Sequence, residues 1–334
     1  MKSNSLRTVA ISIIATFVLF ATISWGPFGH EHINKAAVLA LPEPVRTFFY
    51  NHIDFVTQES TVPDLRKYTL RDNAEKPRHY IDLENYGAAD TIPKTSELAK
   101  RKYDEKFLTS NGILPWYIQD VMVKLTKAFK DKRKTEILFL AADLGHYIGD
   151  AHMPLHTAVN HDGLLTNQKG IHALWEARIP EMFGKDYNFH TEEAKYITNV
   201  EATTWAIIND SHSLIAPLLL ADKNLRESMS NDKMYNLDSK GGIAKNKFND
   251  LIHTDEYVKK YNQALNGMVE KQLKKAIVMT SSYWYTAWVN AGKPDLSSID
   301  TPELTERNKP NLKADLLLWN QGKLFGLESE KDFD

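Results

Sequence analysis

Cysteine is absent from the 334 residues of this chain. Its absence excludes disulfide bonds, thiolate metal sites, a catalytic cysteine and a lipoprotein anchor. Any bound metal must therefore be held by His, Asp, Glu or backbone groups. A dominant sign of charge is also missing, because 41 Lys and Arg residues oppose 43 Asp and Glu residues, a net charge of −2. This balance does not suggest that the protein holds nucleic acid or an anionic membrane by bulk charge.

Internal repeats, low-complexity runs and obvious linkers are absent from the sequence, and alternating strand patterns are few. Apolar residues instead recur at spacings of three and four, which predicts helices. The hydrophobic fraction of 43% is typical of a globular protein that buries a core. We expect one all-α domain over residues 25–292 and a polar surface extension over 293–334, with one short helix near Leu316. The expected helices are His32–Leu41, Pro44–His52, Pro115–Lys130, Lys134–Ala151, Ile171–Phe183, Glu192–Leu220 and Asp255–Ala291.

The one long apolar run, Val9–Ile23, lies near the N-terminus behind two basic residues. It is shorter than the roughly 20 residues that a membrane-spanning helix needs. The small residues Thr22 and Ser24 stand where a signal peptidase reads its substrate. We therefore expect residues 1–24 to be a signal peptide removed before Trp25, and the mature protein to be exported to the periplasm or secreted. An uncleaved membrane anchor is the alternative.

The most informative stretch is LGHYIGDAHMPLHTAVNHDGLLTNQKGIHALWE. It contains two His-x3-acid pairs, His146 with Asp150 and His172 with Glu176, and residues four apart project from the same face of a helix. His156 follows the first pair, just past a proline that must end the helix. A single pair of this kind is often only a surface ion pair. Two pairs among apolar neighbours favour a metal, because burying so many ionisable groups without a cation is costly. Five N and O ligands without sulfur suit zinc.

Further candidate ligands lie upstream of this stretch. Asp64 and His79 are fifteen residues apart, each next to a proline-marked turn, and His30 ends the turn WGPFGH. Cleavage before Trp25 would expose its α-amino group. With an ordinary pKa of about 7.7–8.0, such an amine can be neutral and ligate a metal, which a peptide nitrogen does not do.

Taken in order, these positions resemble the superfamily of bacterial zinc-dependent phospholipases C and single-strand-specific zinc nucleases. The resemblance extends from Trp25 to about Glu181 and implies an all-helical fold with three zinc ions in a cleft. By position, the resemblance implies that Asp64, His79 and His146 hold one zinc. It implies that His30 holds a second zinc together with the amino nitrogen and carbonyl oxygen of Trp25, and that Asp150 bridges these two ions. It implies that His156, His172 and Glu176 hold the third.

The resemblance also implies the chemistry. A hydroxide shared by the two bridged zinc ions would attack phosphorus in line, and the third zinc would neutralise the phosphate oxygens and the leaving group. Asp64 and Asp150 are the catalytic candidates, with Asp64 orienting or deprotonating the attacking water. Tyr80 and Asp82 match positions near the substrate more weakly. Asn160, in the loop between ligands, could also touch substrate, although loop polarity alone explains it.

The residues carry features of both branches of the superfamily. The five-residue interval from Trp25 to His30 and the tripeptide Ile179–Glu181 are nuclease-like. Glu176 and the 16-residue interval from His156 to His172 are phospholipase-like. Our first prediction is a phospholipase C-like phosphodiesterase, and the alternative is a single-strand-specific nuclease or 3′-nucleotidase. A third reading, from another class, is a non-catalytic zinc-binding surface protein.

The remaining predictions concern the binding partners and the C-terminal half of the chain. The expected substrate is a phospholipid or a single-stranded nucleic acid or nucleotide, with no obligate protein partner. Trp284, Tyr285 and Trp288 recur at helical spacing, which predicts core packing or, alternatively, an aromatic lip for acyl chains. Residues 185–334 receive no role beyond helical packing.

Overall fold

The structure is a computed structural model that describes residues 26–245 and 251–324. Within those ranges the chain is helical, and only isolated β-bridges such as Tyr235–His253 occur besides the helices. The all-α prediction is therefore confirmed. No helix in the same ranges is both long and apolar enough to span a bilayer. The expected signal peptide and Trp25 lie outside the described residues.

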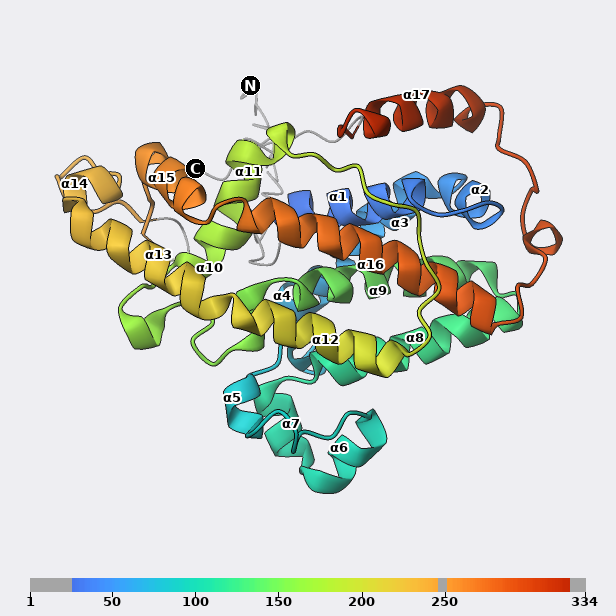
Figure 1. The fold of residues 1–334 in the computed structure, drawn as a ribbon, viewed down its shortest axis with the longest axis horizontal. Coiled ribbons are helices and arrows are strands. Elements are labelled where there is room, and N and C mark those ends of the chain that lie inside the picture. Colours follow the sequence, from blue (N-terminus) through green and yellow to red (C-terminus); the bar gives the residue numbers. More distant parts are fainter. Residues whose placement is uncertain (1–25, 246–250, 325–334) are drawn as a thin grey trace, which may run out of the picture.

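The longest helices run roughly along the long axis of the molecule (Figure 1). They are α1 (Gly26–Leu39), α8 (Leu114–Lys130), α9 (Lys134–Ala151), α12 (Val200–Ser213), α13 (Ile215–Ser228) and α16 (Met268–Asn290). Helix α9 is central, because α1, α8 and α16 all pack against it. Its residues are buried on nearly every side from Ala141 onward, so the helix that carries two candidate ligands is also the core of the fold.

The aromatic residues of α16 belong to this core. Trp284 is fully buried, stacks on Phe49 at 4.9 Å between ring centroids, and donates from Nε1 to the carbonyl of Ala141 at 2.9 Å. Trp288 is also buried. Core packing is thus the correct interpretation of these aromatic residues, and the lip for acyl chains is not formed by the two tryptophans.

Two helices expected to be continuous are broken, each for a local reason. The segment expected as Glu192–Leu220 is helical only from Val200, and it divides at Leu214 into α12 and α13. Pro217 has no N–H for the carbonyl four residues earlier, which favours the division. The segment expected as Asp255–Ala291 divides into α15 (Asp255–Ala264) and α16, with Gly267 between them at φ +74°.

Residues 192–199 are extended rather than helical because their backbone N–H groups have partners elsewhere. Ala194 donates to the carbonyl of Ala40 at 2.8 Å. Lys195 and Ile197 donate to hydroxyl oxygens of α16, those of Ser282 at 3.1 Å and Thr286 at 2.9 Å. The segment therefore ties the end of α1 to α16.

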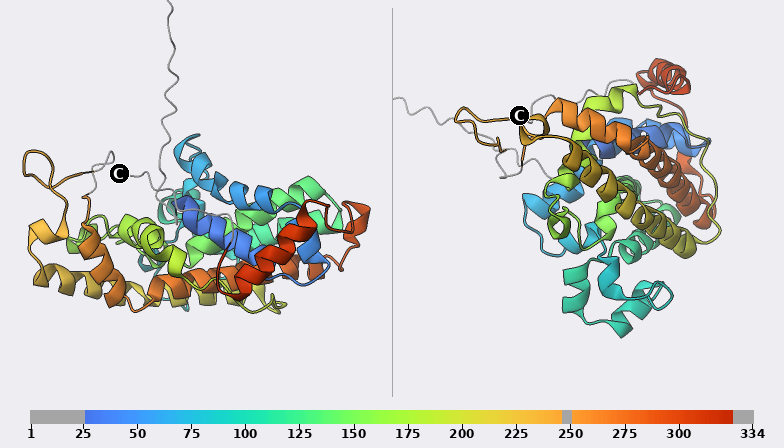
Figure 2. Two further views of the ribbon diagram at one scale, coloured as in Figure 1. Left: turned by 90° about the horizontal axis from the view of Figure 1, so that it is seen from above. Right: turned by 60° about the vertical axis from the view of Figure 1, so that its left-hand side comes forward.

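Short helices complete the structure. They are α2 (Val45–Tyr50), α3 (Ile53–Gln58), α4 (Val62–Tyr68), α5 (Leu83–Tyr86), α6 (Ser96–Lys102), α7 (Glu105–Asn111), α10 (Ile171–Ala173), α11 (Ile179–Phe183) and α14 (Asn231–Met234). Helices α5 to α7 form a small lobe that protrudes from the bundle in two of the views (Figures 1 and 2).

The segment after α16 lies on the N-terminal helices. The expected short helix is α17 (Asn308–Asn320), and Asp315 on it accepts a hydrogen bond from Tyr50 Oη at 2.8 Å. Trp319 is buried and donates to the carbonyl of Phe189 at 3.0 Å. The surface extension is therefore packed against the domain through specific contacts.

Gly145, one residue before the candidate ligand His146, sets how closely α9 approaches α1. A Cβ at this position would lie 1.9 Å from Oδ1 of Asn34. Asn34 cannot easily move away, because its Nδ2 donates to the carbonyls of Val56 at 2.9 Å and Ala142 at 3.2 Å. The glycine thus allows three helices to meet directly behind the candidate site.

We predict that Gly145→Ala lowers the free energy of unfolding by about 1–3 kcal/mol, the usual effect of overpacking a core. Urea unfolding measures this value. In a double-mutant cycle with Asn34→Ala, the two losses should be less than additive, because removal of the amide removes the clash. An increase in stability for Gly145→Ala, as expected from helix propensity alone, would contradict this packing.

Candidate metal centre

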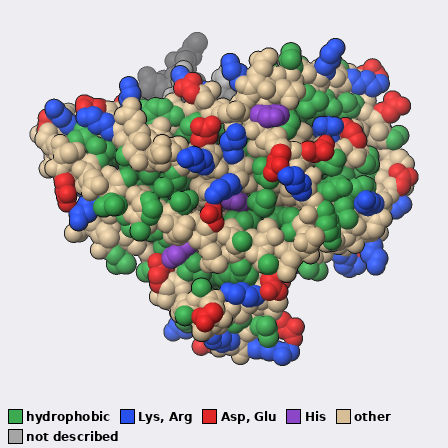
Figure 3. Space-filling model, viewed as in Figure 1, with side chains coloured by type: hydrophobic (Ala, Val, Ile, Leu, Met, Phe, Trp, Pro, Cys, Tyr) green, Lys and Arg blue, Asp and Glu red, His purple; other side chains and the backbone are tan. Residues whose placement is uncertain are grey.

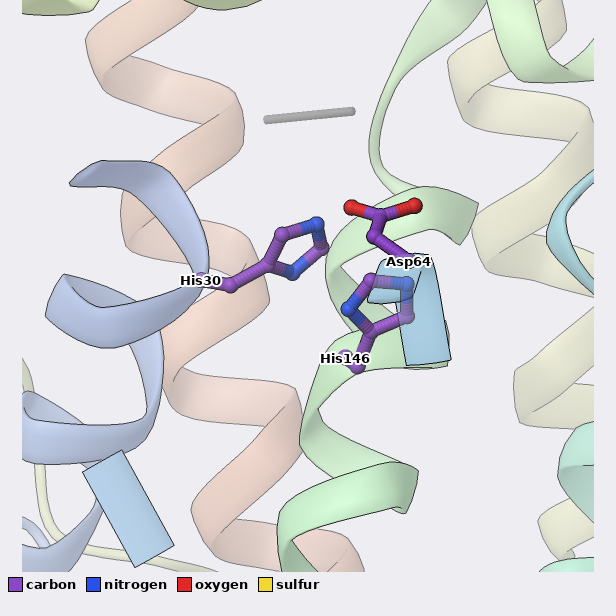
Figure 4. A group of neighbouring side chains, drawn as sticks. All are labelled: His30, Asp64 and His146. Carbon is purple, nitrogen blue, oxygen red and sulfur yellow. The ribbon is translucent and has the colours of Figure 1, made fainter. Parts of the chain in front are cut away.

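The first group of candidate ligands comes from four elements that meet beside α9. His30 lies on α1, Asp64 on α4, His79 at the end of the 3₁₀ helix η2 (Lys76–His79), and His146 on α9. All are at most 3% exposed. Figure 4 shows His30, Asp64 and His146 converging, and the rings of the two histidines stack at 3.8 Å between centroids.

Asp150 lies at the centre of this group. Its Oδ1 is 3.6 Å from Nε2 of His30 and 3.4 Å from Nδ1 of His156. Its Oδ2 is 3.0 Å from Nδ1 of His79 and 3.2 Å from Nε2 of His146. One fully buried carboxylate is therefore surrounded by four imidazoles, as a bridging ligand would be.

His156, His172 and Glu176 form a second group. His156 Nε2 lies 3.3 Å from His172 Nε2, and the two nitrogens lie 3.4 and 2.8 Å from separate oxygens of Glu176. Glu176 belongs to a π-helical segment, Leu174–Arg178, between α10 and α11. Pro180 lacks the N–H that would bond the carbonyl of Glu176 in an α-helix, so a widened turn fits this position.

The donor atoms of both groups fit a cation. Asp64 Oδ1 is buried and accepts no hydrogen bond, and the two buried oxygens of Glu176 face imidazole nitrogens of His156 and His172. Side chains from the two groups form three sets, within each of which the ligand atoms lie within 4.8 Å of one another; two of the sets share His146. Imidazole and carboxylate donors without sulfur are the ligands that zinc accepts in catalytic sites.

The electrostatics of the centre also favour positive charge. Burial opposes a charge on His146, but Asp150 and Asp64 outweigh it and raise the pKa of His146 to about 9. Burial would raise the pKa of Asp150, yet His146 and His156 hold it well below its ordinary value. Asp150 therefore remains ionised and attracts a cation, be it a proton or a metal.

Main-chain carbonyls fix three of the histidine rings. Nδ1 of His146 donates to Ser60 at 2.8 Å, Nδ1 of His156 to His79 at 2.8 Å, and Nδ1 of His172 to His161 at 2.9 Å. In each case Nε2 is left facing the cluster. Such contacts behind a ligating imidazole fix its tautomer and its orientation.

Glu75 is a buried carboxylate behind His79 that the sequence analysis missed. Its partners are Arg66, Arg78 and Tyr147, and His79 Nε2 lies 3.4 Å from its Oε1. Burial would raise the pKa of Glu75, but the contacts with His79, Tyr147 and Arg66 hold it well below its ordinary value. The pair Glu75-x3-His79 has the same spacing as the two pairs recognised in the sequence, and this was the available signal.

A cavity of about 440 Å³ opens beside both groups and is lined by His79, His156 and His172. Tyr80 and Asp82, expected near the substrate, also line it. Asp162, a possible substrate contact in the loop between the ligands, lines it as well. Further residues complete the wall; they are Lys67, Tyr68, Lys76, Ser110, Leu155, His161, Gly170 and Ala173.

Asn160 is not among the lining residues of this cavity. Its Nδ2 donates to Thr166 Oγ1 at 3.0 Å, and its Oδ1 accepts from the backbone N–H of Leu165 at 2.8 Å. The side chain therefore stabilises the loop between the ligands, and the substrate contact expected of it stays a prediction.

The fold and the site define an all-α protein with a buried cluster of imidazole and carboxylate groups beside a cleft, as in a multinuclear metallohydrolase. The family model for S1/P1 nuclease matches residues 25–279, so this chain belongs to the S1/P1 nuclease family. The predicted superfamily is confirmed, and the chain is a zinc-dependent hydrolase that acts on phosphoester bonds. A comparison with curated proteins found no match.

Asp82 supplies a pH-dependent prediction. Burial and the nearby Glu84 raise the pKa of Asp82 to about 6. Asp82 ionises near pH 4 in the unfolded chain but only near pH 6 in the native state. Its ionisation therefore lowers the free energy of unfolding, and this loss is greatest above pH 6. We expect Asp82→Asn to raise Tm at pH 7.5 and to lose this advantage as the pH falls to 4.

Thermal unfolding of both proteins across this pH range measures the difference. The control is Asp90→Asn, which changes an exposed carboxylate in the same region. A Tm difference for Asp82→Asn that is constant with pH would contradict the assignment.

Proposed function

We propose that the protein is an exported, single-strand-specific nuclease or 3′-nucleotidase. Its membership of the S1/P1 nuclease family is the observation that carries this proposal. The family implies a nucleic acid substrate, and the first prediction of a phospholipase C gains no support from it. Burial of Trp284 and Trp288 in the core also removes a feature that would have favoured lipid.

The cleft suits a flexible single strand better than a duplex. Tyr80 and Tyr68 line the cleft and are our candidates for base stacking. Lys67, whose Nζ lies 4.5 Å from the centroid of the Tyr68 ring, and Lys76 supply positive charge for a phosphate. On the face drawn in Figure 3, basic and acidic side chains are interspersed, and no broad basic patch is seen on that face. Recognition is therefore local, through the few nucleotides that enter the cleft.

We assign three zinc ions to the centre. Asp64, His79 and His146 are the proposed ligands of one, His30 and the amino group of Trp25 would hold a second, and Asp150 would be shared by the two. His156, His172 and Glu176 are the proposed ligands of the third. The family match begins at Trp25, the residue whose amino group cleavage of a signal peptide would expose.

Zinc in such a centre lowers the pKa of water and neutralises charge on the phosphate and the leaving group. The protein residues supply position and proton transfer. Asp64 Oδ1 is buried, accepts no hydrogen bond and lies 3.6 Å from His79 Nδ1, so it is the candidate to orient the attacking water and accept its proton. Lys67 Nζ, 3.9 Å from the same oxygen, places a positive charge where the phosphate enters.

Substrate choice is tested by offering the zinc-loaded protein single-stranded DNA, the same sequence as a duplex, and phosphatidylcholine. We expect release of nucleotides from the single strand to be fastest and to stop when zinc is chelated. Tyr80→Ala should raise KM for the single strand by about tenfold, from lost base stacking. Tyr196→Ala, which removes an exposed tyrosine that does not line the cleft, is the matched control. Faster release of diacylglycerol would overturn the nuclease assignment.

Zinc content tests the ligand assignment. A chain beginning at Trp25 should bind three zinc ions, and a chain with one extra residue before Trp25 should bind two, because a peptide nitrogen does not replace an amine. Asp150→Asn should lower both zinc content and turnover, the latter by orders of magnitude. Elemental analysis after dialysis measures the content. Equal zinc in both chains would show that the amine is not a ligand, and near-normal turnover of Asp150→Asn would refute the bridge.

A further inference from the structure

His79 differs from the other candidate ligands in which ring nitrogen faces the cluster. His146 and His172 turn Nε2 toward the carboxylates, at 3.2 Å from Asp150 and 2.8 Å from Glu176. His79 turns Nδ1 inward instead, at 3.0 Å from Asp150 Oδ2. Its ring is therefore reversed relative to theirs, and its Nε2 points away from the cluster.

The group behind His79 is also different. Carbonyl oxygens accept the outer N–H of His146, His156 and His172. The outer nitrogen of His79 instead lies 3.4 Å from the carboxylate oxygen Oε1 of Glu75. The outer nitrogen of His156 also lies 3.4 Å from a carboxylate oxygen, Asp150 Oδ1, but Asp150 is itself a candidate ligand. Of these four rings, that of His79 is the one whose outer nitrogen faces a carboxylate outside the set of candidate ligands.

Glu75 is held so that it cannot turn away from this ring. It is fully buried, and its Oε2 accepts from Arg66 Nε at 2.9 Å and Arg78 Nη1 at 2.8 Å. Its Oε1 accepts from the hydroxyl of Tyr147. Arg66 Nη2 in turn donates to Asp143 Oδ2 at 2.7 Å, so the arginine that holds Glu75 is itself held in place.

A carboxylate in this place has a defined effect on a ligating imidazole. It favours the tautomer with the proton on the nitrogen that faces it, and it makes the opposite nitrogen a stronger donor to a metal. We propose that Glu75 is a positioning residue that holds the proton of His79 on Nε2 and so presents Nδ1 to zinc. This rests on the proposed ligand role of His79 and is independent of which substrate is hydrolysed.

The tautomer is tested directly on the zinc-loaded protein. Long-range proton–nitrogen NMR correlations distinguish protonated, metal-bound and free ring nitrogens. We expect His79 to be protonated at Nε2 and metal-bound at Nδ1, and His146, His156 and His172 to show the reverse. A metal-bound Nε2 at His79 would overturn the proposal, and this measurement needs no variant to fold.

The carboxylate itself is tested by Glu75→Gln, with zinc affinity measured by chelator competition. We expect one zinc to bind about 10–100-fold more weakly, the usual effect of removing a group behind a metal ligand. The zinc assigned to His156, His172 and Glu176 should be unchanged, which separates positioning from a general loss of stability. Glu75→Asp, which keeps the charge, should recover part of the affinity.

The matched control is Asp222→Asn, which changes another buried carboxylate held by an arginine and a tyrosine, Arg226 and Tyr257, that contacts no candidate ligand. It should change all zinc affinities by less than about threefold. Equal zinc affinities in wild type and Glu75→Gln would overturn the proposal. His79→Ala separates the ligand role of His79 from the positioning role of Glu75. If this variant keeps all its zinc, His79 is not a ligand. If His79→Ala loses zinc and Glu75→Gln does not, only the role of Glu75 fails.

Discussion

The contact between buried Asp150 and the four imidazoles around it is the interaction on which the rest of the structure depends. His30, His79, His146 and His156 come from four different elements, and each brings a nitrogen within 3.6 Å of this one carboxylate. Ionised groups this deeply buried are stable only when opposite charge accompanies them. A bound cation therefore stabilises the folded state as well as serving the chemistry. Its removal takes away positive charge that offsets the buried carboxylates around α9.

The fold brings these residues together by close approach of backbones. Gly145 lets α1 and α9 meet, and the π-helical turn before Pro180 carries Glu176 toward His156. The segment of His79 is tied to that of His156, because the N–H of Ile81 donates to the carbonyl of His156 at 2.8 Å. The two groups of ligands are thus connected by a backbone hydrogen bond, next to the cleft that His79 and His156 line.

Local spacing predicted the parts of this site that lie on regular helices. His146 with Asp150 and His172 with Glu176 were found because four-residue spacing fixes a shared helix face. Glu75 escaped notice because it precedes a 3₁₀ helix, where its closeness to His79 depends on tertiary contacts with Arg66 and Tyr147. Helix ends were predicted less well, since the partners of the extended residues 192–199 lie on α16, far away in sequence. The substrate branch could not be derived, because nuclease-like features and phospholipase-like features, such as the Trp25–His30 interval and Glu176, occur together in one ligand pattern.

The measurement that tests this account most directly is X-ray diffraction from crystals of the zinc-loaded protein, collected on both sides of the zinc absorption edge. We expect anomalous peaks at two places. One place lies among Asp64, His79, His146 and Asp150, and the other lies among His156, His172 and Glu176. A zinc-loaded crystal with peaks only at other residues, or with the Asp150 cluster closed by direct hydrogen bonds alone, would contradict it.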